Sequence, residues 1–282
     1  DVRDTHPIFA ETREWGVPVS LSQEMLAIHE GKAAAVGLDA TKPFSCEAML
    51  HALRVAQERG LPDAALLMTP PFVMTLAASH GAETREGQLR IAEETRELFS
   101  RFLELSPAYA RIAATRHQDF LRGEAMMAHF STAMAPMLET GSPFAYHLQA
   151  LPVLPGQMLR LVACVIAVSP ATPYPEEAEC LAHFLGSEEA QRILVRHRYA
   201  IPARTALLET AITGTFPALE VCREGLRRGR PFAPYGFRSP EYMDLVFAPI
   251  ATAIMDRTLP LDRGLDRMRE WTQLLHLSLI HI

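Results

Sequence analysis

An uninterrupted apolar segment from Leu161 to Val168 restricts most strongly what this chain can fold into. It has the length of a strand, and a continuous apolar run is typical of a strand covered on both faces, because a half-exposed strand alternates apolar and polar residues. The segment Pro175–Leu185 then predicts a helix, with proline at its start and Glu176 and Glu177 in its first turn, where both residue types are favoured. A buried strand followed by an amphipathic helix indicates an α/β architecture.

The rest of the chain alternates helical and strand-like patterns. The helical patterns have apolar residues three and four apart and serine, glycine or proline boundaries. They cover Ser45–Arg59, Phe72–His80, Arg85–Leu105, Arg116–Arg122, Ser187–His197, Phe216–Arg228, Pro240–Asp256 and Leu261–Leu275. The strand-like patterns cover Ala64–Met68, Ala125–Phe130 and Leu148–Val153. We expect the end of the strand Ala125–Phe130 to deliver side chains to a cleft.

Composition places the chain among globular proteins. Its 282 residues allow one large domain or two of ordinary size. Hydrophobic residues make up 49% and charged residues 21%, which excludes a disordered or fibrous chain. The net charge is −6 and the longest basic run is Arg227-Arg228, so we expect no nucleic acid to be bound by this segment. No uncharged apolar run reaches the roughly 18 residues that a membrane-spanning helix needs.

The beginning of the chain and its cysteines bear on where the protein acts. The chain opens with Asp1-Val2-Arg3-Asp4, with neither an initiator methionine nor a signal pattern, which is expected of a mature form or a fragment. The cysteines show no C-x-x-C spacing, so no zinc ribbon or thioredoxin-like motif is expected. We interpret all four as small buried hydrophobes, which favours a cytosolic history. They are Cys46, Cys164, Cys180 and Cys222.

Motifs that carry catalysis are missing from the sequence. It contains no G-x-S-x-G, G-x-x-x-x-G-K-[ST], G-x-G-x-x-G or H-E-x-x-H. The acidic pairs Glu93-Glu94 and Glu176-Glu177 are expected on solvated helix faces, where carboxylates do not converge as an acid/base pair. We therefore expect a protein that is not an enzyme and that holds no cofactor or metal.

Several segments together carry a family resemblance. In order and spacing they resemble the extracellular solute-binding proteins of family 1, the carbohydrate-binding components of ABC importers. The segments are Phe120–Met127, Leu151–Pro155, Pro175–Gln191 and Ile201–Arg204, with fainter matches at Phe44–Phe72, Thr75–Ala82 and Phe247–Met255. The resemblance covers most of the chain and is strongest between Asp119 and Leu208.

The resemblance implies an α/β fold, a two-lobe clamshell of the periplasmic-binding-protein-like type II class whose N-terminal lobe is incomplete. Roughly the first hundred residues of such a protein have no counterpart here. Residues 1–42 would form the tail of the N-terminal lobe and the first crossing, and 43–164 the main part of the C-terminal lobe. Residues 165–212 would return to the N-terminal lobe and 213–282 would close the C-terminal lobe. The final segment His276–Ile282 resembles nothing in the family, which leaves open whether it is native.

Two functions fit this resemblance. In the first, a periplasmic or lipid-anchored extracellular protein binds a sugar or oligosaccharide between its lobes and delivers it, as a monomer, to the ABC permease in a bacterial membrane. In the second, the same fold is the cytoplasmic ligand-sensing domain of a transcriptional regulator, fused to a winged-helix DNA-binding domain. The sequence upstream of Asp1 would distinguish the two.

Sugar recognition needs aromatic faces for the C–H groups of a pyranose and polar side chains for its hydroxyls. Aromatic residues make up only 7% of the chain, so those expected at the lip of the cleft stand out. The resemblance and the positions after strand ends or proline breaks point to Phe72, Phe130, Tyr235 and Phe247 as stacking residues, with His129, Ser131 and Thr132 as their polar partners. For each aromatic residue, ordinary core packing is the alternative.

Overall fold

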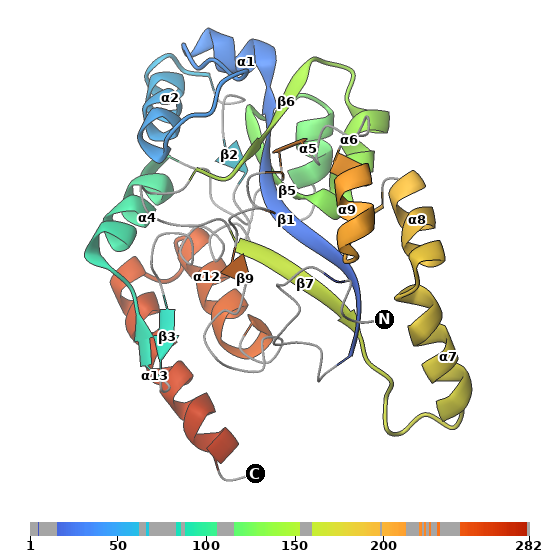
Figure 1. Cartoon of the computed structure of the whole chain (residues 1–282). Helices are drawn as coiled ribbons and strands as arrows, with labels where there is room; N and C mark the ends of the chain where they lie inside the picture. Colours follow the sequence, from blue (N-terminus) through green and yellow to red (C-terminus); the bar gives the residue numbers. More distant parts are fainter. Residues whose placement is uncertain are drawn as a thin grey trace. The chain divides into compact units, whose positions relative to one another are not determined.

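The computed structural model of the chain (Figure 1) describes residues 5, 16–61, 66–67, 83–85, 88–105, 116–152, 160–197, 199–212, 220–221, 223, 226, 230–231 and 243–280. Its contacts divide the chain into two compact units. Unit 1 comprises Asp1–Met25, Phe130–Gly141 and Leu159–Phe232, and unit 2 comprises Leu26–His129, Ser142–Met158 and Ala233–Ile282. These boundaries differ from the lobe ranges suggested by the family resemblance, and the assignment of lobes stays a prediction.

Unit 1 is built on the first half of strand β1 (Val17–His29), to which no strand was assigned from the sequence. Strand β7 (Arg160–Ile166) pairs with it antiparallel, from Val17 opposite Ile166 to Gln23 opposite Leu161. Strand β8 (Ile201–Pro202) also pairs antiparallel with β1, and β9 (Arg230–Pro231) pairs parallel with the start of β7.

Beside these strands, the described part of unit 1 contains helix α6 (Ala135–Gly141) and four further elements. They are the 3-10 turn η4 (Thr132–Met134), α7 (Pro175–Leu185), α8 (Glu188–Arg196) and α9 (Thr205–Ile212). Helix α7 has the predicted bounds. Helix α8 begins as predicted, because the side chain of Ser187 caps it by accepting a hydrogen bond from the Ala190 N–H.

A buried glutamine ties α8 to the rest of unit 1. Gln191 donates from its side-chain nitrogen to the carbonyls of Pro18 and Gly186, and its side-chain oxygen accepts from the backbone N–H of Arg204. The Arg204 guanidinium donates in turn to the Gly186 carbonyl, over 3.0 Å. Each hydrogen-bonding function of the Gln191 amide is thus used within unit 1.

Strand β7 is less covered than its sequence predicts. Residues 162–166 are only half-buried, so the expectation of cover on both faces is wrong for the described structure. Among the described residues, β9 pairs with Arg160 and Leu161 alone and α7 buries Ala182 alone, so little cover for residues 162–166 comes from these two elements. The apolar side chains of Leu181 and Phe184 on α7 are 57% and 46% exposed.

The cysteines also differ in how far they are buried. Cys46 is buried, Cys164 is half-buried and Cys180 is exposed, so the prediction of buried cysteines holds for Cys46 and is wrong for Cys180. Cys180 lies on α7, whose surface is largely uncovered. Cys222 lies outside the described residues.

Unit 2 contains the second half of β1, whose residues Leu26, Ala27 and Ile28 are completely buried. Strand β5 (Met127–Ser131) pairs with β1 on one side and, in parallel, with β2 (Leu66–Leu67) on the other; β6 (Tyr146–Ala150) also pairs with β1. The predicted strands at Ala64–Met68, Ala125–Phe130 and Leu148–Val153 are therefore confirmed, with shifted or shorter bounds.

The helices of unit 2 include α2, which begins and ends within one residue of its prediction because Ser45 caps it. The described helices are α1 (Glu30–Ala35), α2 (Cys46–Glu58), α4 (Glu93–Leu105), α5 (Arg116–Leu121), α12 (Ala248–Met255), which follows the π-helical turn η5 (Met243–Phe247), and α13 (Leu261–Ile280). None of the described helices has the length and apolar character to cross a membrane. The predicted helices at Phe72–His80 and, for the most part, Phe216–Arg228 lie outside the described residues.

The predicted long helix Arg85–Leu105 is wrong in its first part. The start of this segment instead contains the end of β3 (Glu83–Arg85) and the whole of β4 (Gln88–Arg90), which pair as a two-stranded antiparallel sheet. Helix α4 follows β4. Helix α4 begins at Glu93 and Glu94, which place negative charge at the positive end of its dipole. Pairing between β3 and β4 satisfies backbone groups that a longer helix would have used.

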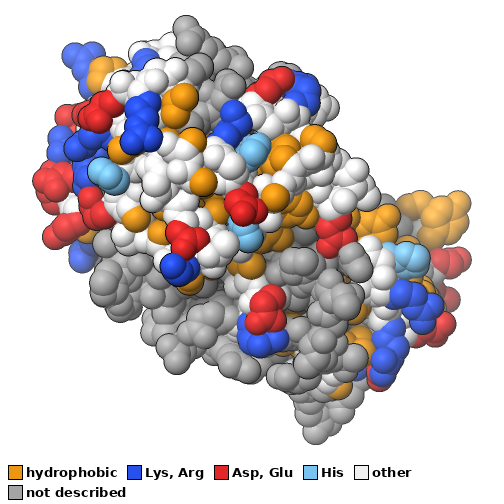
Figure 2. Space-filling view, turned by 90° about the horizontal axis from the view of Figure 1, so that it is seen from above, with side chains coloured by type: hydrophobic (Ala, Val, Ile, Leu, Met, Phe, Trp, Pro, Cys, Tyr) orange, Lys and Arg blue, Asp and Glu red, His pale blue; other side chains and the backbone are white. Residues whose placement is uncertain are grey.

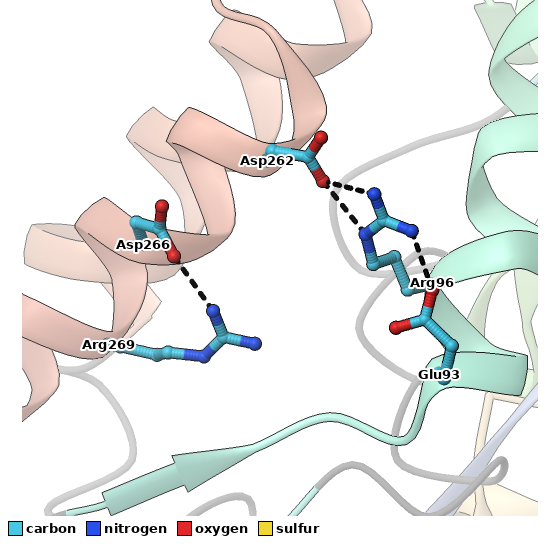
Figure 3. A network of polar contacts seen from close by, with 5 residues as sticks. All are labelled: Glu93, Arg96, Asp262, Asp266 and Arg269. Atoms are coloured by element: carbon cyan, nitrogen blue, oxygen red, sulfur yellow. Dashed lines mark hydrogen bonds and ion pairs between the residues drawn. The ribbon is translucent and has the colours of Figure 1, made fainter.

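Exposed ion pairs join helices of unit 2 (Figure 3). Arg96 on α4 contacts Glu93 at 2.6 Å and Asp262 on α13 at 2.7 Å, and Arg269 pairs with Asp266 within α13. Such exposed pairs add little stability, but they favour one alignment of the two helices. On the face that Figure 2 shows, acidic and basic side chains are interspersed, without a large area of one sign.

The uncovered apolar side chains of unit 1 predict that the 282-residue chain associates with itself at micromolar concentration. Replacing both Leu181 and Phe184 by lysine should then shift the chain towards monomer without lowering its melting temperature, because both residues are exposed. Glu176→Lys is the matched control, since it changes the net charge of α7 by the same two units, from one negative to one positive side chain, but leaves the apolar side chains in place. Sedimentation velocity measures the distribution; a monomeric parent chain with a sharp two-state melt would contradict the prediction.

His29 predicts a pH-dependent stability. Its Nδ1 accepts a hydrogen bond from the Lys32 N–H at the start of α1, and its ring stacks on Phe144 at 4.1 Å. Burial, and then the charge of Lys32, lower the pKa of His29 below 6.5, so folding favours the neutral ring. The stabilisation is present above the unfolded pKa and is lost as the pH falls through the lower folded pKa.

The test compares melting temperatures of the parent and His29→Asn between pH 8 and pH 5. Asparagine keeps a capping acceptor but does not titrate, so the parent should lose more stability than the variant as the pH falls below about 6.5. Melting curves that fall in parallel would refute the role of His29.

Candidate functional site

The predicted polar residues follow strand β5 to its end. Ser131 is the last residue of β5 and is half-buried, and Thr132 opens the turn η4 with only 1% of its surface exposed. Both belong to unit 1. The end of the strand therefore carries two neighbouring hydroxyl groups, one half-buried and one buried, and their delivery to a cleft stays a prediction.

Thr132 contacts strand β1 through its side chain. Its hydroxyl oxygen lies 3.2 Å from the hydroxyl of Ser22 and accepts a hydrogen bond from the backbone N–H of Gln23 at 3.3 Å. The structure thus brings Ser22 and Gln23, which the sequence analysis did not select, to the predicted Thr132. The Gln23 side chain lies on the opposite face of β1 from that of Ser22, so Gln23 meets Thr132 only through its backbone, and we call Ser22, Ser131 and Thr132 the hydroxyl cluster.

Gln23 itself is an unusual residue of β1. Its side chain is completely buried, and neither its oxygen nor its nitrogen has a hydrogen-bond partner. Buried polar groups in native proteins are nearly always paired, so each exception needs an explanation. The sequence gives little warning of this position, because Gln23 follows the alternating pattern of Val17, Val19 and Leu21 along the strand.

The other predicted site residues are buried or fall outside the described residues. His129, in unit 2, is buried, and its backbone carbonyl lies 3.1 Å from the Nε2 atom of His117 on α5. Phe130 is completely buried and Phe247, at the end of η5, is 4% exposed. Phe72 and Tyr235 lie outside the described residues. Burial favours core packing for Phe130 and Phe247, and a ligand-binding role for either stays a prediction.

The chemistry available in the cluster is that of neutral hydrogen bonding. Two hydroxyl groups of serine and one of threonine can donate hydrogen bonds to a polar ligand and accept them from it. Among the described residues, no group of three histidine, cysteine or acidic side chains is arranged to hold a metal ion. Burial raises the pKa of the Cys46 thiol to about 12, so this thiol is not a nucleophile at neutral pH.

Comparison with solved structures identifies proteins of the same fold. An extracellular solute-binding protein of family 1 from Alicyclobacillus acidocaldarius is 16% identical, with a TM-score of 0.70 over 98% of this chain and 76% of that chain. An ABC substrate-binding protein from Listeria monocytogenes, solved with cycloalternan, is 16% identical, with a TM-score of 0.75 over 92% and 70% of the two chains. The sugar-binding protein MalE from Xanthomonas citri is 12% identical, with a TM-score of 0.76 over 99% and 76%.

No known family's sequence profile matches the chain, and no curated protein matches it. The sequence identity to these solved structures is low, but the structural match extends over almost the whole of this chain and about three quarters of theirs. The chain therefore has the mixed α/β, two-lobe periplasmic-binding-protein-like fold of the extracellular solute-binding proteins of family 1.

Proposed function

We propose that the chain is part of a substrate-binding component of an ABC importer and that it binds a neutral sugar or oligosaccharide. Fold alone does not determine function, so the proposal needs support from a site. The supporting observation is the hydroxyl cluster at the end of β5, in which the hydroxyls of Thr132 and Ser22 lie 3.2 Å apart and Ser131 is half-buried. Such groups match the alternating donors and acceptors of a sugar's hydroxyls.

The proposal extends to where the protein acts and what it meets. Solved structures of the same fold include proteins described as extracellular and as sugar-binding. We propose an extracellular or periplasmic location, a permease in the membrane as partner, and no enzymatic activity of the chain itself. The ligand roles of Phe72, His129, Phe130, Ser131, Thr132, Tyr235 and Phe247 belong to this proposal, with Ser131 and Thr132 the best supported by their contacts and position.

A second candidate function, the cytoplasmic sensor domain of a transcriptional regulator, is favoured by one observation. Cys180 is an exposed free thiol on α7 and Cys164 is a half-buried one. Exposed free thiols are more typical of a reducing compartment than of an exported protein. Both candidate functions require a small-molecule ligand, so the binding test below applies to either.

Ser131 offers a test of the site with little structural cost, because it is half-buried at the end of β5 rather than part of the core. With maltose, maltotriose and other neutral oligosaccharides as probes, calorimetric titration should find a ligand for the parent chain. Ser131→Ala should then weaken binding about three- to tenfold, the effect of one neutral hydrogen bond, while the melting temperature stays the same.

Ser169→Ala serves as the control for this experiment, because Ser169 is an exposed serine of the same unit that only supports a turn through the Ala171 N–H. It should leave the affinity unchanged. Equal affinities of the parent and Ser131→Ala would remove Ser131 from the site, and a parent chain that binds none of these sugars would refute the proposed function.

Phe130 distinguishes a stacking role from a packing role. Because its ring is completely buried, we expect Phe130→Ala to cost about 3–5 kcal/mol of stability, as for other buried phenylalanines, and to weaken binding only through unfolding. Thermal melts run beside the titration separate the two roles. Binding that is lost while the melting temperature holds would show that the ring contacts the sugar.

A further inference from the structure

We infer that the uncovered face of unit 1, formed by helices α7 and α8 and the outer edge of strand β7, is the packing surface for a segment of the same polypeptide that precedes Asp1. The occupant is a covalently joined segment, and a second copy of the chain is the alternative that the experiment below separates from it. Sugar binding plays no part in this inference, so a failure of the proposed function would leave it standing.

Exposed large apolar side chains are concentrated on α7 and α8, which follow one another along the margin of unit 1 (Figure 1). Half of those found among the described residues lie in the stretch 174–199. They are Tyr174, Leu181, Phe184, Ile193 and Tyr199, with exposed fractions between 44% and 65%. A single exposed apolar residue is ordinary, but a group of this size on two successive helices marks an interaction surface.

Strand β7 also lacks cover. Its residues 162–166 are half-buried at every position, so neither face of the strand is fully covered, because successive side chains point to opposite faces. Along one edge β7 pairs with β1 as far as Ile166, whereas along the other edge β9 pairs with Arg160 and Leu161 alone among the described residues. An apolar strand with such an edge is a template for a further strand.

Proteins of the same fold contain the length of chain that such a cover needs. The structural match takes in 98% and 99% of this chain but only 76% of the family 1 protein from Alicyclobacillus acidocaldarius and of MalE from Xanthomonas citri. About a quarter of each of those proteins therefore has no counterpart here. A segment of that length is enough for several strands and helices.

The start of the chain lies beside this face. Thr5 is buried and forms an antiparallel bridge with Arg204, whose guanidinium donates to the carbonyl of Gly186 at the end of α7. A segment joined to Asp1 is therefore held near α7 at a high effective concentration, whereas a second copy must first lose its translational and rotational freedom. This difference favours the joined segment as the occupant.

The test compares the 282-residue chain with the complete product of its gene, translated from its own start codon. Cys180, an exposed thiol one turn before Phe184, reports on the surface, and the buried Cys46 is the control within the same chain. The probe is a maleimide, applied at nanomolar protein concentration and read out by peptide mass spectrometry. We expect Cys180 to react at least about tenfold more slowly in the complete product, and Cys46 to be protected in both.

A double substitution gives a second readout. Leu181→Lys together with Phe184→Lys should lower the melting temperature of the complete product by about 5 °C or more, because it places two charges in a packed surface, and should leave that of the 282-residue chain unchanged. Glu176→Lys, which keeps the apolar side chains, should have the same small effect in both. A double variant that fails to fold only in the complete product would support the inference for the same reason.

Three results would overturn the inference. A gene product that begins at Asp1 has no such segment. A longer product in which Cys180 reacts as fast as in the 282-residue chain leaves the face open. A longer product that still dimerises in sedimentation velocity, and becomes monomeric with the double substitution, has a second copy as its occupant. None of these results bears on sugar binding by the parent chain, which the titration tests separately.

Discussion

Backbone pairing along β1 is the constraint on which the rest of the described structure depends. This strand supplies hydrogen-bonding partners to β5, β6, β7 and β8, and the chain passes from unit 1 to unit 2 between its residues Met25 and Leu26. Its first half alternates buried and half-exposed side chains, as a strand does when one face is covered, and its residues 25–28 are all buried. Gln23 lies just before that change of pattern, at a position where a buried side chain is expected to be apolar.

Elements that depend on neighbours in the sequence could be predicted well. Helices α2 and α8 begin where Ser45 and Ser187 place a hydroxyl against the first free N–H groups, and α7 begins at a proline. These signals act over three or four residues, so the sequence displays them directly. Strand β1 and the β3–β4 pair could not be predicted in the same way, because a strand is stabilised by partners that the local sequence does not show.

The same distinction between local signals and distant partners explains which residues of the candidate site could be predicted. Ser131 and Thr132 were found from their position after an apolar strand, which is local information. Ser22 and Gln23 were missed because their importance comes from contact with Thr132 across the sheet and from the absence of a partner for one amide. Phe130 was selected because it is aromatic, but residue type does not reveal burial, and its ring lies in the core. Phe72 and Tyr235, which lie outside the described residues, remain predictions from the sequence.

Burial and hydrogen bonding place opposite demands on a position such as Gln23. A methionine there would fill the same space without leaving a donor and an acceptor unpaired, and so would suit the fold better. Proteins usually break the rules of local consistency at functional sites, where the cost to folding is offset by what the group does for a ligand. Gln191 shows that this chain can satisfy a buried amide completely when the amide serves the fold. The amide of Gln23 has no such partners on the buried face of β1 that it shares with Val19 and Leu21, so it is the position in unit 1 where burial and hydrogen bonding conflict most clearly.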